Sequence, residues 1–437
     1  MPRSFDTIFM GAAGGSSDSF WIALLGGSDT EEAIGITVDS SDNIFVCGPT
    51  ASDGAGNTDG LLAKYNTDGT LLWDKTLGGS ARDYFYASAT DSNGNVYVSG
   101  YTASQGVAYY DVLTTKYNSS GAIQWQRILG QTYYDTGDAI AVDSSGNVYV
   151  TGRLRNSEQV DHLSLLKYNT SGSLQFQTAL NWGGDKGSHG RGIAFDSSGD
   201  ILICGNNKPS ANYSNQFALV KYNSSGALQY NKIFGNQSGG NRQLRGIAID
   251  SSDNIYLSGL GNDHSVITKL NSSLSTQWTR KLTASGQNAY ADFYDVVVDG
   301  DGNAYACGAY IGSYALLAKY NSSGVLQWQN KLTVGTNQCL FNAITITSLG
   351  TPIVTGYVNG DGAGAKDVVV LKLPADGSGH GTYGSMVYAS SSLTDAAFTL
   401  PTIADRGTGT GSPSGTAATS TLTSADAVLS SELFELS

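Results

Sequence analysis

The side chains of this 437-residue chain that could do acid–base or metal chemistry are few and scattered. Its four histidines, His162, His189, His264 and His380, show none of the HxH or HExxH spacings that bring two imidazoles to one metal. Only five of its 37 acidic residues are glutamates, and most aspartates stand in repeated turn sequences. No carboxylate pair for glycoside hydrolysis and no nucleophile elbow can therefore be singled out. We expect a protein that is not an enzyme and has no catalytic residue.

One segment, Asp299-Gly300-Asp301-Gly302-Asn303, resembles the first half of an EF-hand calcium loop. The bidentate Glu that would complete such a loop is missing from the sequence that follows. Corresponding segments elsewhere read Asp-Ser-Ser-Asp-Asn or Asp-Ser-Asn-Gly-Asn, which are ordinary turn formers. A turn is therefore favoured over a Ca²⁺ site, and no metal or cofactor is expected.

Another set of side chains is suited to recognition. These are tyrosines, with a histidine and an arginine, in segments that vary in length and composition between regular repeats. Aromatic rings offer stacking area to sugars or partner proteins, and polar groups orient a ligand. The alternative is that several of the tyrosines begin a strand and pack between neighbouring repeats. The predicted binding residues are Tyr84, Tyr86, Tyr109, Tyr110, Tyr133, Tyr134, His189, Arg191, Tyr213, Tyr290 and Tyr294.

The repeat that separates these segments recurs seven times. One copy reads Asp-Ser-Ser-Gly-Asn-Val-Tyr-Val-Thr-Gly and runs from Asp143 to Gly152. It alternates with a second phrase, Lys-Tyr-Asn-x-x-Gly, which an aromatic residue follows. Three cysteines occupy the slot before a closing glycine, where we expect small buried thiols rather than disulfides. The closing glycines are Gly48, Gly100, Gly152, Gly205, Gly259, Gly308 and Gly356.

Each repeat predicts four short antiparallel strands, because β-branched and aromatic residues alternate between turn sequences. Four strands in about 50 residues are the size of a propeller blade. The sequence therefore predicts an all-β fold, a seven-bladed β-propeller of four-stranded antiparallel blades over residues 20–385. Residues 20–26 match the fourth strand of later repeats, so an N-terminal strand is expected to complete the last blade and close the ring. Residues 383–388 are the alternative closing strand.

Composition excludes several functions. The net charge is −13 and charged residues make up only 14% of the chain. Binding to nucleic acid requires a basic surface, which this acidic chain is not expected to provide. No run of about 18 apolar residues occurs, so membrane insertion is not expected. The apolar patch Ile8–Met10 is too short for a secretory leader, and no signal peptide is expected.

The repeat resembles those of seven-bladed propellers in bacterial surface proteins and tailed bacteriophages. The flanks are similar to virion proteins of marine phages, in Phe9-Met10-Gly11-Ala12-Ala13-Gly14-Gly15 and in two segments at 371–377 and 381–385. The resemblance implies a structural component of a virion, often of a tail or tail fibre, made in the host cytoplasm. It implies no catalytic set.

Residues 1–19 and 386–437 form extensions outside the repeat, and the second is rich in Ser, Thr, Gly and Ala. We expect them to make assembly contacts through Phe9, Met10, Leu433 and Phe434. The expected partners are other virion proteins, copies of the chain itself, and a glycan or protein of the host surface. Two alternatives are a carbohydrate-binding or carbohydrate-active propeller of a bacterial surface, and an intracellular protein-interaction scaffold.

Overall fold

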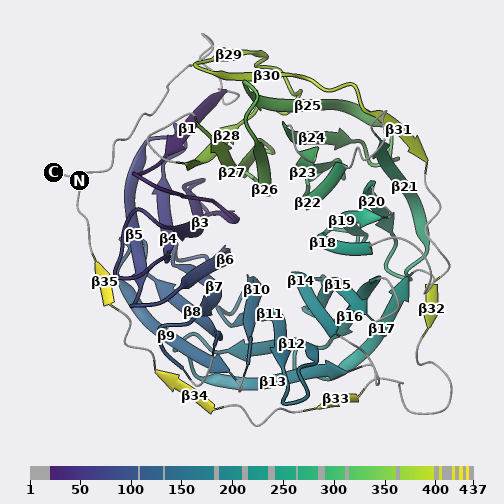
Figure 1. Ribbon diagram of the computed structural model, residues 1–437. Coiled ribbons are helices and arrows are strands. Elements are labelled where there is room, and N and C mark those ends of the chain that lie inside the picture. The colour runs from purple at the N-terminus through teal and green to yellow at the C-terminus, as the bar shows by residue number, and fades with distance from the viewer. Residues whose placement is uncertain are drawn as a thin grey trace.

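A computed structural model of the chain describes residues 20–397, apart from short gaps, and four short strands beyond them. Seven antiparallel sheets of four repeat strands stand around a central axis (Figure 1), so the predicted all-β propeller is confirmed. No helix that could cross a membrane occurs among these residues. The gaps are at 107–108, 131–132, 182–186, 209–214, 235–241, 262–263, 284–290, 311–313 and 361–364, and the later strands are at 403–405, 416–418, 423–426 and 430–432.

Within each blade the strands follow one another outward from the axis (Figure 1). Blades one to three contain β2 (Gly35–Val38), β3 (Ile44–Thr50), β4 (Asp59–Tyr65) and β5 (Leu71–Gly78); β6 (Asp83–Thr90), β7 (Val96–Thr102), β8 (Asp111–Tyr117) and β9 (Ile123–Gly130); and β10 (Thr136–Val142), β11 (Val148–Arg155), β12 (Asp161–Tyr168) and β13 (Leu174–Asn181). Blades four and five contain β14 (Gly187–Phe195), β15 (Ile201–Lys208), β16 (Gln216–Tyr222) and β17 (Leu228–Phe234); and β18 (Arg242–Ile249), β19 (Ile255–Gly261), β20 (Ser265–Leu270) and β21 (Thr276–Thr283). Blade six contains β22 (Ala291–Val298), β23 (Ala304–Tyr310), β24 (Tyr314–Tyr320) and β25 (Leu326–Val334).

Blade seven is built from both ends of the repeat region. It contains β26 (Cys339–Ile346), β27 (Pro352–Asn359), β28 (Lys366–Lys372) and, outermost, β1 (Trp21–Leu25). β1 pairs with β28 in an antiparallel register from Trp21 opposite Lys372 to Leu25 opposite Val368. The N-terminal closure of the ring is thus confirmed. The alternative is wrong, because Met386–Ser390 pairs with β25 of blade six instead.

In the turn sequences, the side chain of the first residue accepts hydrogen bonds from backbone N–H groups that follow it. In the segment considered for calcium, Asp299 Oδ1 accepts hydrogen bonds from the backbone N–H groups of Asp301 and Asn303, at 3.0 and 2.8 Å. Oδ2 accepts from the side chains of Asn303 and Tyr305, at 2.8 and 3.2 Å. These are the hydrogen bonds of the favoured turn, in which an Asp side chain folds the backbone that follows it.

The core consists of apolar layers between neighbouring blades. One layer joins Phe45 and Leu62 of blade one to Phe85 and Val98 of blade two. Cys47 lies in the same layer, and Cys204 and Cys307 are equally buried and free, as predicted. Sheets that bury both faces in this way hold each innermost strand in a fixed place beside the axis.

Aromatic side chains of the outermost strands fasten each blade to the next. Trp125 of β9 donates from Nε1 to the carbonyl oxygen of Thr170, in the turn of blade three, at 3.2 Å. Its ring lies against Gly172, where φ is +80° and a Cβ atom would approach within 2.7 Å. Trp21 and Trp278 make the same hydrogen bond, to Thr67 and Ser322. The repeated aromatic residue is therefore a clasp between blades.

The C-terminal extension packs on the outside of the propeller. β29 (Gly381–Tyr383) directly precedes the extension, whose first described strands are β30 (Met386–Ser390) and β31 (Thr394–Ala397); β30 pairs with β25, and β31 pairs with β21 of blade five. Such pairing satisfies backbone groups that an outermost strand leaves open. Further along, four short strands pair with the outermost strands of blades four to one (Figure 1): β32 (Ile403–Asp405), β33 (Thr416–Ala418), β34 (Thr423–Asp426) and β35 (Ser430–Glu432).

Candidate functional site

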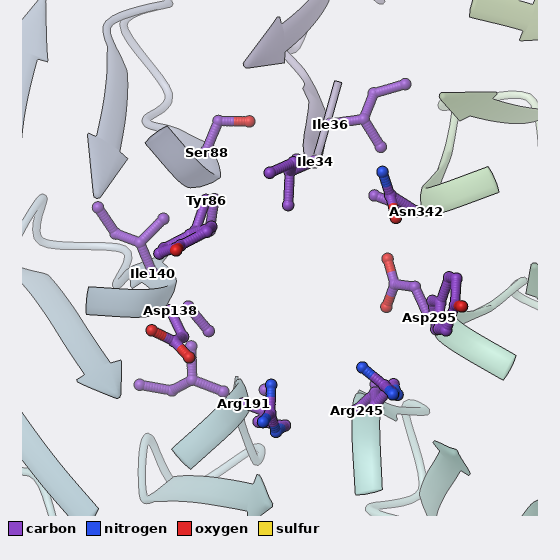
Figure 2. A pocket seen from close by; sticks show the side chains of 18 of the residues that line it. Ile34, Ile36, Tyr86, Ser88, Asp138, Ile140, Arg191, Arg245, Asp295 and Asn342 are labelled. Atoms are coloured by element: carbon purple, nitrogen blue, oxygen red, sulfur yellow. The ribbon is translucent and has the colours of Figure 1, made fainter. Parts of the chain in front are cut away.

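The loop face of the propeller carries the connections between blades and between the second and third strands of a blade, such as residues 79–82 and 51–58. At its centre lies a cavity of about 780 Å³. The innermost strands of all seven blades, or residues directly before them, line this cavity, and Figure 2 shows their side chains around it. The repeat thus brings seven sequence-distant segments to one site.

A β-bulge places one side chain of nearly every blade in the cavity. In six innermost strands the pairing with the second strand skips one residue. A bulged residue leaves the ladder of hydrogen bonds, and its side chain is aimed in a new direction. In blade one the corresponding residue directly precedes β2. We call these seven cavity-lining residues the bulge ring: Ile34, Tyr86, Asp138, Arg191, Arg245, Tyr294 and Asn342.

The bulge ring combines constant spacing with changing chemistry. Each of its members precedes the closing glycine of its repeat by 14 residues, as Ile34 precedes Gly48. The residue after each member is Gly or Ala in six blades, which leaves room for the ring side chains near the axis. In blade six it is Asp295. Side chains at this one position are apolar, aromatic, amide, acidic and basic, whereas the turns hardly vary.

Arginines of blades four and five make one side of the bulge ring basic. Arg245 Nη2 lies 3.0 Å from Asp292 Oδ2, whereas Arg191 Nε donates to the amide oxygen of Asn206 at 3.2 Å. Burial lowers the pKa of Arg191; the charge of Asp138 opposes this shift, and the neighbouring charges of Arg245 and Arg153 add to it. Nearby guanidinium groups that repel one another favour the arrival of an anion.

A third guanidinium lines the cavity beside them. Arg153 Nη1 is 3.5 Å from Asp161 Oδ2, and Arg155 Nε binds the same carboxylate at 2.6 Å. One carboxylate therefore serves two arginines. The Nε atoms of Arg153 and Arg245 are buried and have no hydrogen-bond partner in the described part of the chain. This side of the cavity keeps unused donors in a protein whose net charge is −13.

Asp138 and His189 form a buried pair next to these arginines. Nε2 of His189 contacts Oδ2 of Asp138. Burial acts to raise the pKa of Asp138, but His189 and then Arg191 outweigh burial and lower it. Burial lowers the pKa of His189. Asp138 is therefore ionised at neutral pH. No group of three His, Cys, Asp or Glu side chains suited to a metal occurs in the described ranges.

Asp295 holds blades six and seven together below the bulge ring. Its Oδ1 accepts from the backbone N–H of Val296 at 2.8 Å, and its Oδ2 from that of Ile344 at 3.1 Å. Burial raises the pKa of Asp295 to about 7. Burial also raises the pKa of Asp292 to about 6, although Arg245 opposes the shift.

Six tyrosines of blades two and three form a continuous row from the cavity to the rim. Ring centroids of neighbours in the row are 4.2 to 6.0 Å apart, which is the range of favourable aromatic contacts. The inner end lines the cavity, and the outer end, Tyr109, is 63% exposed. The tyrosine row comprises Tyr86, Tyr84, Tyr101, Tyr110, Tyr134 and Tyr109.

The structure brings together most of the residues predicted for binding. Five of the predicted tyrosines lie in the tyrosine row, while His189, Arg191 and Tyr294 line the cavity. Tyr84 and Tyr86 are half-buried on an innermost strand, so the packing expected of such tyrosines occurs at the site itself. Tyr133 is half-buried, and its carbonyl accepts from Tyr110 N at 3.4 Å. Tyr213, Tyr290, Phe9, Met10, Leu433 and Phe434 lie outside the described residues.

Sequence reasoning missed Asp138, Arg245, Asn342 and Asp295 in the cavity, and Tyr101 in the tyrosine row. The first three could have been found, because their distance to the closing glycine is constant. Tyr101 follows a closing glycine directly and stands in a strand whose neighbours are core residues. Its role depends on stacking with Tyr110, which lies beyond the following loop, and no local sequence pattern reveals this contact.

Comparisons with known proteins agree with this fold. Residues 21–54 and 124–153 match the family described as Beta-propeller repeat, and residues 40–71 match the family described as Domain of unknown function (DUF5122) beta-propeller. The "Uncharacterized WD repeat-containing protein L264" of Acanthamoeba polyphaga mimivirus is 23% identical over a match that covers 33% of this chain. That match spans only 14% of the viral protein.

Among solved structures, a protein from Lactobacillus plantarum is similar at 10% identity and a TM-score of 0.49, covering 80% of this chain and 99% of that one. The polysaccharide lyase Uly1 is similar at 9% identity and a TM-score of 0.46, covering 80% and 91%. These likenesses are too distant to assign an activity. The repeat matches and the seven blades together identify the chain as a seven-bladed β-propeller that contains beta-propeller repeats.

Proposed function

We propose that this chain is a recognition propeller, a non-enzymatic structural component of a bacteriophage virion that binds its target through the loop face. The observation that carries the proposal is the bulge ring, where one equivalent position differs in chemistry from blade to blade. A purely structural position would repeat like the turns do. Binding surfaces, in contrast, combine a rigid scaffold with side chains of varied chemistry.

The tyrosine row extends this site toward the rim. Large, rigid, amphipathic rings give contact area at low cost in conformational entropy, and they are common at recognition sites. Its exposed end, Tyr109, stacks on Tyr134 at 5.3 Å, and Arg155 lies over the Tyr134 ring at 5.2 Å. Tyr101 in the middle of the row is only 5% exposed, so a target would meet Tyr109, Tyr110 and Tyr134 at the rim and Tyr84 and Tyr86 at the cavity end.

The binding test uses the labelled full chain and a panel of bacterial strains, measured by flow cytometry. We expect the double variant Tyr109→Ala/Tyr134→Ala to lose at least tenfold in apparent affinity, because aromatic anchors dominate such interfaces. The matched control, Leu72→Ala/Leu349→Ala, removes two exposed apolar side chains at the opposite end of the blades and should bind normally. Equal binding by wild type and the tyrosine variant would contradict recognition by the loop face.

The virion placement rests on the resemblance of the repeat and flanks to phage proteins, and it makes other virion proteins and copies of the chain the expected partners. Cryo-electron microscopy of phage particles that carry the chain should show seven-bladed rings at fixed positions on the tail. Particles without such rings would remove the virion role. The second candidate is a carbohydrate-binding propeller of a bacterial surface. It would use the same site, and the polar side chains of the bulge ring favour this candidate.

A further inference from the structure

From the bulge ring and the tyrosine row we infer the class of ligand: an acidic glycan whose sugar rings lie along the tyrosine row and whose carboxylate binds Arg191 and Arg245 in the cavity. This inference rests on the proposed recognition function and deepens it. It needs three properties of the site: a cationic seat, polar partners for hydroxyl groups, and aromatic side chains between the cavity and the rim.

The cationic seat is the side of the cavity formed by blades three to five. Arg191 has an amide oxygen rather than a carboxylate as its hydrogen-bond acceptor, and Arg153 shares its carboxylate with Arg155. Arg245 is paired with Asp292 through Nη2, and its Nε is unpartnered among the described residues. Arginine forks bind carboxylates with two parallel hydrogen bonds, which gives both affinity and orientation.

The acidic groups of the cavity do not cancel this seat. Asp138 is engaged by His189, and Glu32 binds Lys366 at 2.5 Å on the far side. The carboxylate of Asp295 already accepts two backbone hydrogen bonds, and burial favours its protonated form. An incoming anion therefore faces guanidinium groups that have spare donors, next to acids that each have at least one partner, although Asp138 Oδ1 has none among the described residues.

The remaining lining favours a sugar over a simple anion. Asn342 and Tyr294 belong to the bulge ring, and Ser88 also lines the cavity, so the cavity holds acceptors and donors for hydroxyl groups. Figure 2 shows Ser88 and Asn342 across the cavity from Arg191 and Arg245. Tyr86 lines the cavity and is also the inner end of the tyrosine row. A ligand with polar edges and apolar ring faces fits this succession, because the faces stack on tyrosines while the edges bind polar groups.

The test is an array in which each uronate-containing oligosaccharide is paired with its methyl ester, followed by calorimetry with oligogalacturonate hexamer and its ester. We expect binding only by members with a free carboxylate, and at least tenfold weaker binding of the ester. Arg191→Gln and Arg245→Gln should each weaken binding about tenfold, since each removes a charge-assisted pair. Arg191→Lys should retain part of the affinity, and circular dichroism checks that each variant is folded.

The control is Arg280→Gln, which removes the same charge from an outermost strand, where Nε donates to the Gly324 carbonyl. It should leave affinity unchanged. Equal binding of acid and ester, or normal binding by both cavity variants, would overturn the acidic ligand while leaving recognition intact. Absence of any glycan binding, with cell binding still lost in Tyr109→Ala/Tyr134→Ala, would overturn the glycan in favour of a protein receptor. If the tyrosine variant binds cells normally, the proposed function itself fails.

Discussion

Asp295 occupies a position where the other six blades have glycine or alanine. Its carboxylate joins two blades through backbone hydrogen bonds, and burial raises its pKa to about 7. An unfolded chain would release that proton near the ordinary value of 3.8. Between these two values the folded state binds more protons than the unfolded state, so this residue lowers stability as pH rises.

We predict that Asp295→Asn removes this pH dependence. Between pH 6 and pH 8 the free energy of unfolding of the wild type should fall by about 1.4 kcal/mol relative to the variant, as expected for one group with a pKa near 7. Urea unfolding at the two pH values measures the difference. His189 contributes with the opposite sign, because burial lowers its pKa, but it is common to both proteins and cancels.

The exposed Asp301→Asn is the matched control and should follow the wild type at both pH values. If Asp295→Asn and the wild type keep a constant difference in unfolding free energy, Asp295 does not hold its proton in the folded state. The pH-independent loss of one hydrogen-bond acceptor in the variant does not affect this comparison.

Residue types suggested the site better than residue positions did. Tyr86 and Arg191 stood out because they are aromatic and basic side chains in the variable segments between the repeated phrases. Asp138 did not, because aspartate is the commonest acid of the turns, and only its bulge separates it from them. A bulge depends on which backbone groups pair across strands, and no single side chain records that choice.

At the scale of elements, the outermost strands carry the clasp that joins blades. Trp125 is 8% exposed and combines packing against Gly172 with one hydrogen bond to Thr170. We predict that Trp125→Ala lowers the free energy of unfolding by about 3–5 kcal/mol, as for other buried aromatic truncations. Trp125→Phe should cost less, because it keeps most of the packing and loses the hydrogen bond, worth about 1 kcal/mol.

Urea unfolding gives these differences, and Gln124→Ala on the same strand serves as the reference. Gln124 is exposed and bonds only its own turn, so its removal should change stability by less than about 0.5 kcal/mol. Equal effects of Trp125→Ala and Gln124→Ala would show that the clasp contributes nothing.

The strands of the blades could be predicted because alternation and turn residues repeat seven times. The strands of the extension could not. β31 consists of Thr394, Asp395, Ala396 and Ala397, a composition with little β propensity. It forms because the edge of β21 offers open backbone groups, so the partner strand rather than its own sequence decides the structure.

At the scale of the whole molecule, the extension ties the outer rim to the closing blade. Tyr388 of β30 is fully buried, accepts a hydrogen bond from Asn330 Nδ2 at 2.7 Å and lies 5.6 Å from the ring of Phe20. We predict that Tyr388→Ala lowers the free energy of unfolding by about 3–5 kcal/mol. Thermal unfolding followed by circular dichroism provides the measurement.

Val387→Ala, on the same strand, is the comparison, because Val387 is 38% exposed. Val387→Ala should lower the free energy of unfolding by less than about 1 kcal/mol, since this side chain buries little apolar surface when the protein folds. A Tyr388→Ala protein as stable as Val387→Ala would indicate that the extension rests on the rim without supporting it.

The closing pair in blade seven also sets the order of events during synthesis. Trp21 leaves the ribosome early, but its partner Lys372 is made 351 residues later. At about 5–20 residues per second this interval lasts roughly 20–70 s. During this interval β1, an apolar strand that is fully buried in the native fold, has no partner strand in its own chain. Nascent chains of this protein are therefore expected to need chaperones, and truncated products to aggregate through the unfinished blade.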